Sequence, residues 1–248
     1  MVTASHNENG WTGVKMGAQK PLTFGPDEMS RLKDIVLDAQ FVERDGGKLI
    51  RVEGQAQRYI DDVAKRASIT RPLKVIAACG NEHGRRLRGR SLTEDGRCGR
   101  GPHGHGPGLS PSPKYNPNPE DAEMLHAMAH AVREHKADLA FGFDGDGDRC
   151  GVVDDEGEEI FADKIGLMLA RDLAPLHPGA TFVVDVKSTG LYATDPILAE
   201  HGCKVVHWKT GHSYIKRKSA GLRRPGRLRE ERPLLHERRT GLRLRLAA

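Results

Sequence analysis

Three aspartates alternate with two glycines in the stretch Asp144-Gly145-Asp146-Gly147-Asp148, and Arg149 follows directly. The glycines relax the backbone, so we expect the three carboxylates to converge on one turn. Carboxylates brought together repel one another, and a divalent cation removes that cost. Ligation by oxygen alone favours Mg²⁺, Mn²⁺ or Ca²⁺ over Zn²⁺. The stretch therefore predicts a divalent-metal site, and the fork of donors on Arg149 could hold an anion beside the metal.

Two other interpretations of this stretch are open. A solvated acidic turn would need no metal. A calcium EF-hand loop begins in the same way, but its sixth position would be Arg149, where glycine is required, and its twelfth would be Asp155 instead of glutamate. Predicted strands also flank the stretch, where an EF-hand has helices. We therefore favour Mg²⁺ bound for phosphoryl transfer.

A second candidate for chemistry is the stretch Thr3-Ala4-Ser5-His6-Asn7, which is followed by Gly10, Gly13 and Lys15. A serine beside a histidine, in a glycine-containing loop with a lysine, can be an activated nucleophile or a phosphate carrier. An ordinary polar loop can have the same composition. The stretch by itself leaves both interpretations open.

Helices and strands alternate along the regions that hold these motifs. Apolar residues at helical spacing, or in short runs between turn residues, predict the elements. The expected helices are 27–40, 55–69, 119–136, 163–173 and 191–201, and the expected strands are 73–79, 138–143, 150–153, 181–186 and 204–208. Such alternation predicts an α/β fold with largely parallel strand pairing. The acidic stretch would then join two strands.

Composition narrows the class of protein. The chain has 248 residues, 37% of them hydrophobic, and a net charge of +5. No apolar run approaches the ~20 residues of a membrane span, and the N-terminus has neither the basic nor the apolar part of a secretory signal. The four cysteines form no C-x-x-C pair, which favours thiols in a reducing compartment. We therefore expect a cytoplasmic protein that does not bind membranes.

Two segments account for the positive charge. Residues 82–112 are rich in Gly, Arg, Pro and His, and residues 219–248 are rich in Arg, Leu and Gly. Neither composition can bury enough apolar surface to offset chain entropy, so we expect disorder in both. Two origins are open: a genuine basic linker and tail, or out-of-frame translation of a GC-rich gene. The tail has almost no aromatic residues for base stacking, which argues against nucleic-acid binding.

Taken together, the motifs resemble those of a known family. Thr3 to Asn7 with Gly13-Val14-Lys15, then Asp144 to Arg149, then Lys209-Thr210-Gly211-His212-Ser213 have the order found in the α-D-phosphohexomutases. The chain is similar to the bacterial phosphomannomutase/phosphoglucomutase branch over most of residues 1–81 and 113–218. The resemblance implies repeated mixed-sheet α/β domains of the phosphohexomutase type.

The resemblance also implies roles for individual residues. The metal ligands would be Ser5, as a phosphoserine, with Asp144, Asp146 and Asp148, around one Mg²⁺. The catalytic residues would be Ser5, His6, Lys15, Arg149 and Lys187. The base that takes the proton of the sugar hydroxyl would be one of His6, Lys15 and Lys187. The substrate-binding residues would be Lys187, Gly211 and His212.

The implied reaction is phosphoryl transfer that converts mannose or glucose 6-phosphate to the 1-phosphate. Phosphoserine 5 would donate its phosphoryl group, and a hexose 1,6-bisphosphate would turn around and return its other phosphate. The partners would be small-molecule hexose phosphates, with no nucleic acid, membrane or obligate protein partner. The alternative is a non-catalytic fragment that binds Mg²⁺ or sugar phosphates.

Finally, the resemblance divides the chain. We expect a remnant of domain one with the phosphoserine loop at residues 1–45, and domain two with the metal loop and the irregular 82–112 at residues 46–156. The start of domain three would follow at residues 157–218, and a disordered tail at residues 219–248. Domain four and the sugar-recognition loop after Gly211 are expected to be absent, and Glu8 stands where proline is common. Because such parts normally orient the substrate, the resemblance implies impaired turnover.

Overall fold

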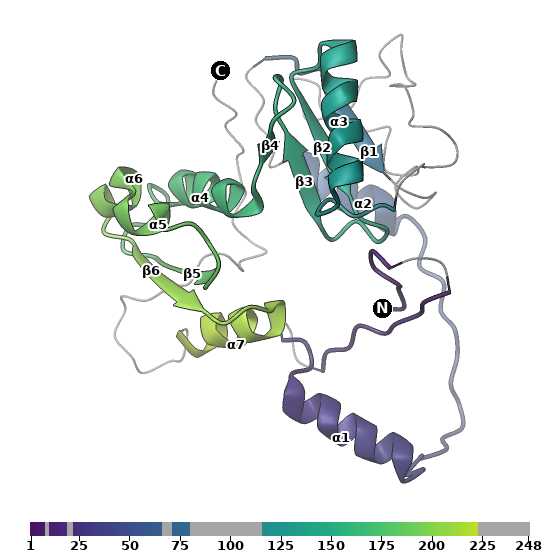
Figure 1. The fold of residues 1–248 in the computed structure, drawn as a ribbon. Helices are drawn as coiled ribbons and strands as arrows, with labels where there is room; N and C mark the ends of the chain where they lie inside the picture. The colour runs from purple at the N-terminus through teal and green to yellow at the C-terminus, as the bar shows by residue number, and fades with distance from the viewer. Residues whose placement is uncertain (8–9, 19–21, 66–70, 80–115, 223–248) are drawn as a thin grey trace. The chain divides into compact units, whose positions relative to one another are not determined.

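A computed structural model describes residues 1–7, 10–18, 22–65, 71–79 and 116–222 (Figure 1). The chain divides into two compact units. The described part of the first unit comprises stretches within 1–14 and 60–173. That of the second comprises stretches within 15–59 and 174–222. The segment 82–112 and residues 223–248, for which we expect disorder, lie outside the described residues.

The first unit is built on a four-stranded mixed sheet in the order β1-β2-β3-β4. Its strands are β1 (Val75–Cys79), β2 (Leu139–Phe143), β3 (Cys150–Val153) and β4 (Glu159–Ile160). β1 and β2 are parallel, whereas β2–β3 and β3–β4 are antiparallel. The expected, largely parallel pairing is therefore wrong for these two ladders, because connections this short can join only antiparallel neighbours. β4 has two residues, too few to show a periodic pattern.

Helix α3 (Ala122–His135) covers the sheet of the first unit. Asp121 caps its start by accepting a hydrogen bond from the Glu123 backbone N–H at 3.0 Å. Met124, Met128 and Val132 are spaced four residues apart and are all fully buried. They form one core with apolar side chains from the strands, namely Ile76, Ala78, Ala140 and Val153. The acidic stretch thus leaves the sheet from a strand that α3 holds firmly.

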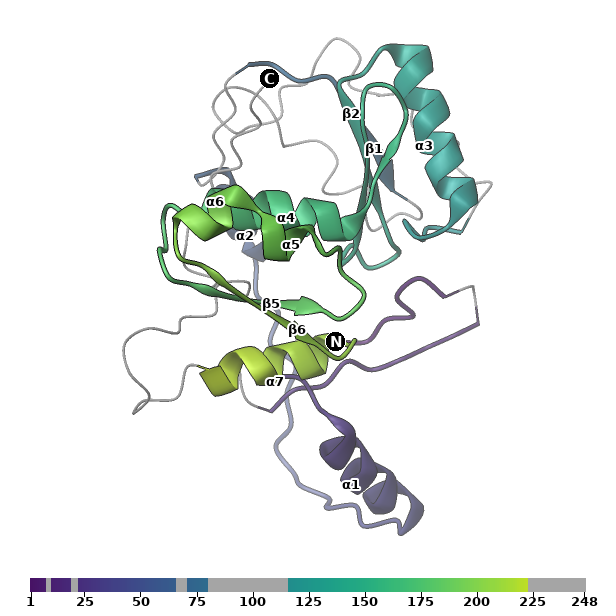
Figure 2. The same ribbon diagram turned by 60° about the vertical axis from the view of Figure 1, so that its left-hand side comes forward.

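The second unit contains a parallel strand pair, β5 (Thr181–Asp185) and β6 (Lys204–Trp208), with helix α7 (His212–Leu222) packed against both (Figure 2). Helix α1 (Pro26–Leu37) belongs to the same unit. Along the chain, the boundary between the two units falls within helix α2 (Gln55–Ala64). Helix α4 (Ala162–Leu173) belongs to the first unit. Among the described residues, no helix has the length and apolar character that a membrane span requires.

The predicted helix 191–201 is two short helices, α5 (Leu191–Thr194) and α6 (Pro196–Glu200). Asp195 separates them with an extended backbone, and its carboxylate accepts hydrogen bonds at 3.1 Å from the backbone N–H groups of Ile197 and Leu198. A residue before proline avoids helical angles, so Pro196 ends the first helix and starts the second. The prediction missed this break.

Helix α7 was not expected from the sequence. It follows Gly211, whose φ of +123° is a conformation that glycine adopts readily, and it begins at His212. Its basic composition hides the apolar periodicity that predicts a helix. Ser219 to Leu222, which we assigned to the disordered tail, form its last turn, with Ser219 buried.

Candidate active site

The acidic stretch forms a tight loop between β2 and β3. The backbone N–H of Gly147 donates to the carbonyl oxygen of Asp144 at 3.1 Å, and Gly147 has a φ of +70°. The Asp144 carboxylate accepts further hydrogen bonds from the N–H groups of Asp148 and Arg149, at 3.0 and 3.2 Å. Asp144 is thus the acceptor around which the loop is organised, and only 4% of it is exposed.

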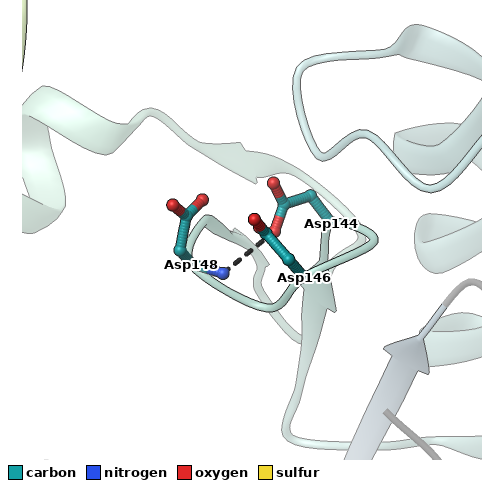
Figure 3. Close-up of side chains that lie close together, drawn as sticks. All are labelled: Asp144, Asp146 and Asp148. Carbon is teal, nitrogen blue, oxygen red and sulfur yellow. Dashed lines mark hydrogen bonds between the residues drawn. The ribbon is translucent and has the colours of Figure 1, made fainter. Parts of the chain in front are cut away.

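The three aspartates of the loop present their carboxylates together. One ligand oxygen from each of Asp144, Asp146 and Asp148 lies within 4.8 Å of the other two. Figure 3 shows the three side chains pointing to the same side of the loop. Their exposure increases along the stretch, from buried through intermediate to exposed. The set is therefore open to solvent at one end and anchored in the protein at the other.

The electrostatics of the loop match a cation site. Burial raises the pKa of Asp144, and the neighbouring charges of Asp146 and Asp148 raise it further, against the opposing effect of the two backbone N–H donors. A divalent ion would relieve this repulsion, and three carboxylates without nitrogen or sulfur ligands suit a hard ion such as Mg²⁺. The residues present therefore fit the predicted metal.

The two glycines of the loop have different roles. We expected both to relax the backbone, and Gly147 does so through its positive φ. Gly145 does not have a positive φ, and its role is instead to leave room for a neighbouring segment of backbone. A Cβ atom at Gly145 would collide with the carbonyl oxygen of Ser5. The missing side chain therefore allows the serine loop to approach the acidic loop.

Ser5 lies directly against the carboxylates. Its hydroxyl Oγ is 3.4 Å from Oδ2 of Asp144, and Nδ1 of His6 is 3.4 Å from the same hydroxyl. Ser5 has a φ of +56°, a left-handed conformation that non-glycine residues adopt at a cost of about 1 kcal/mol or more. Such strain persists only where surrounding contacts hold it, as they do here.

Thr3 is one of the residues that hold Ser5, and the prediction did not give it a role. Its hydroxyl accepts a hydrogen bond from the Ser5 N–H at 2.8 Å and donates one to Oδ2 of Asp146 at 2.9 Å. The Thr3 N–H also donates to the Gly13 carbonyl at 3.0 Å. One hydroxyl therefore ties the serine loop to a predicted metal ligand. Its place two residues before Ser5 was the available signal.

Asn116 is a second residue that the prediction missed. Its side-chain amide donates to the carbonyl oxygen of His6 at 2.8 Å, across 110 residues of sequence. Arg149, predicted as catalytic, is about one-third exposed, and its guanidinium lies 3.4 Å from the Glu120 carboxylate. No pattern in the sequence pairs either of these residues with its partner.

The remaining predicted residues belong to the second unit. Lys187 follows β5, and its N–H donates to the Asp185 carboxylate at 2.8 Å. The same Asp185 oxygen accepts a hydrogen bond at 2.9 Å from the hydroxyl of Thr210, the residue before Gly211. Lys187 and Gly211 thus lie at the carboxyl ends of two parallel strands, the edge where α/β sheets bind ligands.

His212 and Lys15 complete the predicted set. His212 is the first residue of α7, and its Nδ1 is 3.3 Å from the hydroxyl of Thr23. Lys15 also belongs to the second unit, beside the short bridge between Val2 and Val14. The structure therefore brings Ser5, His6 and the three aspartates together in one unit and Lys187, Gly211 and His212 together in the other.

Comparison with known proteins identifies a family whose members are similar to this chain. The model of the phosphoglucomutase/phosphomannomutase α/β/α domain II matches residues 57–157, and that of α/β/α domain III matches residues 161–222. A phosphoglucomutase from Neisseria gonorrhoeae is 30% identical over 228 residues, which cover 87% of this chain and 46% of the relative. A phosphomannomutase/phosphoglucomutase from Pseudomonas putida is 32% identical over 229 residues, which cover 88% of this chain and 46% of the relative.

A solved structure agrees with these matches. The crystal structure of a phosphoglucomutase/phosphomannomutase family protein from Burkholderia thailandensis superposes with a TM-score of 0.74 at 28% identity, covering 89% of this chain and 46% of that one. The chain spans about half the length of the curated relatives it matches. Two successive domain matches, the relatives and the common fold confirm the resemblance read from the motifs, and the chain belongs to the phosphoglucomutase/phosphomannomutase family.

Proposed function

We propose that the chain carries the phosphoryl-transfer centre of a phosphohexomutase, which interconverts hexose 6-phosphates and 1-phosphates through a phosphoserine at Ser5. The observation that carries the proposal is the 3.4 Å approach of the Ser5 hydroxyl to Asp144, within a cluster of three carboxylates. Without a phosphoryl group, nothing in the chemistry of a serine requires three acids at its side. With one, the arrangement suits a metal-assisted transfer.

The protein's own side chains would divide the work in this centre. Asp144, Asp146 and Asp148 would hold Mg²⁺, which when bound offsets negative charge on the transferring group. When the phosphoryl group leaves Ser5, its Oγ must regain a proton, and the imidazole of His6 lies 3.4 Å away to supply one. Arg149 would hold phosphate oxygens, exchanging its exposed contact with Glu120 for the anion.

The second unit would supply the contacts to the sugar. Lys187, Gly211 and His212 are the candidates, with Lys15 and Lys187 as further candidates for proton transfer. Hexose 1,6-bisphosphate would be the intermediate and activator. We also propose that the protein is located in the cytoplasm. Since relatives of about twice this length carry the activity in their names, we expect weak turnover from these 248 residues on their own.

Mass spectrometry of the purified chain tests the proposal directly. After incubation with glucose 1,6-bisphosphate and Mg²⁺, we expect a phosphate on Ser5. Ser5→Ala should abolish the modification and any turnover of glucose 1-phosphate or mannose 6-phosphate in a coupled assay. Ser30→Ala, an exposed serine on α1, is the matched control and should leave both unchanged.

The non-catalytic alternative makes a different prediction for the same experiments. A fragment that only binds ligands would take up Mg²⁺, lose that binding in Asp146→Ala, and never acquire phosphate on Ser5. Metal binding that depends on Asp146, together with an unmodified Ser5, would therefore contradict the mutase proposal and favour the binding module.

A further inference from the structure

The outer surface of helix α3 carries a pair of histidines one turn apart. Met124 and Met128 of this helix are fully buried against the sheet. His126 and His130 each follow one of these methionines by two residues, about 200° further round the helix, and both are exposed. Among the twelve histidines of the chain, they are the only two separated by four positions. The packing of α3 on the core thus presents two imidazoles to solvent on one face.

The spacing of the two histidines suits a chelate. Side chains four residues apart on a helix stand one above the other, with Cβ atoms about 5–6 Å apart, so two imidazoles can reach one ion. Two histidines at this spacing on one helix face are an established zinc-binding arrangement. The helix itself is well defined, since Asp121 caps its start and Lys136 ends it in a left-handed conformation. Little backbone ordering would therefore be needed on binding.

Both rings line one shallow hollow of about 430 Å³, together with Ala129, Arg133 and Glu134. This is room enough for an ion that keeps several waters, each of which takes about 30 Å³. The Arg133 guanidinium is engaged by other groups, because it donates to the carbonyl oxygens of Glu156 and Gly157 at 2.8 and 3.2 Å. The hollow therefore offers imidazoles and a carboxylate to a cation.

The carboxylate of Glu134 lies against one of the two rings. Its Oε2 is 3.5 Å from Nδ1 of His130 and 3.7 Å from Nε2 of His135. With Nδ1 of a neutral His130 facing an acceptor, the hydrogen belongs on Nδ1, and Nε2 keeps the lone pair that a metal takes. The ring of His126 has no hydrogen-bond partner among the described residues. His135 lies about 140° round the helix from His130, outside this stripe.

We propose that His126 and His130 chelate a divalent transition-metal ion of the zinc class on the outer face of α3, at a site that shares no ligand with the acidic loop. Imidazole nitrogen suits Zn²⁺, Ni²⁺ and Cu²⁺, whereas Mg²⁺ prefers oxygen. The two sites would therefore select different ions. Water would fill the remaining positions around the metal. The inference does not rest on the proposed function, because neither histidine belongs to the predicted catalytic set.

Calorimetric titration of the whole chain with Zn²⁺ tests the site. Mg²⁺ is kept in large excess to occupy the acidic loop, and a pH of about 7.5 lies above the ordinary histidine pKa near 6.5. We expect His126→Ala and His130→Ala each to weaken Zn²⁺ binding at least about 10-fold, since loss of even an outer partner of a ligand costs that much. The two losses should not add, because removing either imidazole already breaks the chelate.

Two variants serve as controls. His135→Ala is on the same helix but outside the stripe, and His207→Ala removes an exposed imidazole from β6, so both should bind Zn²⁺ as the unmodified chain does. His126 and His130 are exposed and alanine is the strongest helix former, so the test variants should keep α3, which circular dichroism checks. Identical isotherms for the unmodified chain and the double variant would overturn the inference. Losses that add, as for two independent rings, would also overturn it.

Nitrogen NMR with ¹⁵N-labelled histidine locates the metal without reference to affinity. On addition of Zn²⁺, the ring signals of His126 and His130 should change together, with the larger change at Nε2 of His130, and those of His207 should stay the same. Unchanged rings of His126 and His130 beside calorimetric binding would assign the metal to other groups and overturn the inference. Neither experiment involves Ser5, so a failure of this site and a failure of the proposed function are distinguishable.

Discussion

At the scale of single residues, the proposed catalytic centre depends on close approach as much as on charge. Ser5 adopts a left-handed backbone, and its carbonyl oxygen lies where a side chain on residue 145 would be. Carboxylates alone would make a metal site of a common kind. The lack of a side chain at Gly145 lets a serine reach this one, and the proposed phosphoryl transfer would need that approach.

A substitution at Thr3 best tests whether the contact between the serine loop and the acidic loop supports the predicted metal site. Thr3→Val keeps the shape of the side chain but loses the hydroxyl that links the Ser5 N–H to Asp146. We expect Mg²⁺ affinity, measured by calorimetry, to fall about 10-fold, as it does when partners of metal ligands are removed. Thr3→Ser keeps a hydroxyl and should retain most of the affinity. Equal affinities for the valine and serine variants would contradict a role for the hydrogen bond.

At the scale of elements, Asp138 secures the entry to the parallel pair β1–β2. Its carboxylate accepts a hydrogen bond from the Lys74 N–H at 2.6 Å and one from the Arg71 guanidinium at 2.7 Å. The Lys74 hydrogen bond, followed by that of Arg71, lowers the pKa of Asp138. Since β2 leads directly to the acidic loop, this anchor fixes where that loop begins.

The lowered pKa gives a pH-dependent contribution to stability. The native state holds the charged form more strongly than the unfolded state does. The stabilisation is therefore fully present above the unfolded pKa, near 3.9, and is lost as the pH falls through the lower folded pKa. We expect Asp138→Asn to cost about 1 kcal/mol of unfolding free energy at pH 7, given the partial exposure of the pair. The difference from the unmodified chain should vanish in acid.

Denaturant unfolding at several pH values measures this difference. Asp155→Asn, on an exposed turn of the same unit, is the control and should change stability little at any pH. A loss for Asp138→Asn that stays constant down to pH values well below 3.9 would show that the charge is not responsible.

At the scale of the whole molecule, the predicted chemistry is divided between two units. The predicted metal ligands and Ser5 lie in the first, and Lys187, Gly211 and His212 in the second. Mg²⁺ should therefore stabilise the first unit selectively, because a ligand stabilises only what it binds. Hydrogen exchange with and without Mg²⁺ should slow for amides of β2 and β3 and stay the same for those of β5 and β6. Equal protection in both units, or none in the first, would contradict this assignment.

Some elements of the fold could be predicted from the sequence, and others could not. The α/β class, most of the elements and the acidic loop were predictable, because apolar periodicity and alternating aspartates express local rules. The break at Asp195 and the helix α7 were not predicted. A proline effect was overlooked in the first case, and a basic composition concealed the helix in the second. The antiparallel pairing of β2 with β3 follows from a connection too short for a crossover.

The sequence by itself determined the chemical inventory: three carboxylates on a glycine-containing loop, a serine beside a histidine, and motifs in the order of one family. These follow from residue type and spacing, which short stretches carry completely. Only the tertiary structure decided which groups meet. Thr3 bridges Ser5 to Asp146, Asn116 holds His6, and the Thr23 hydroxyl lies 3.3 Å from Nδ1 of His212, all through contacts between residues more than a hundred positions apart. Such pairings depend on the packing of whole elements, so no local pattern encodes them.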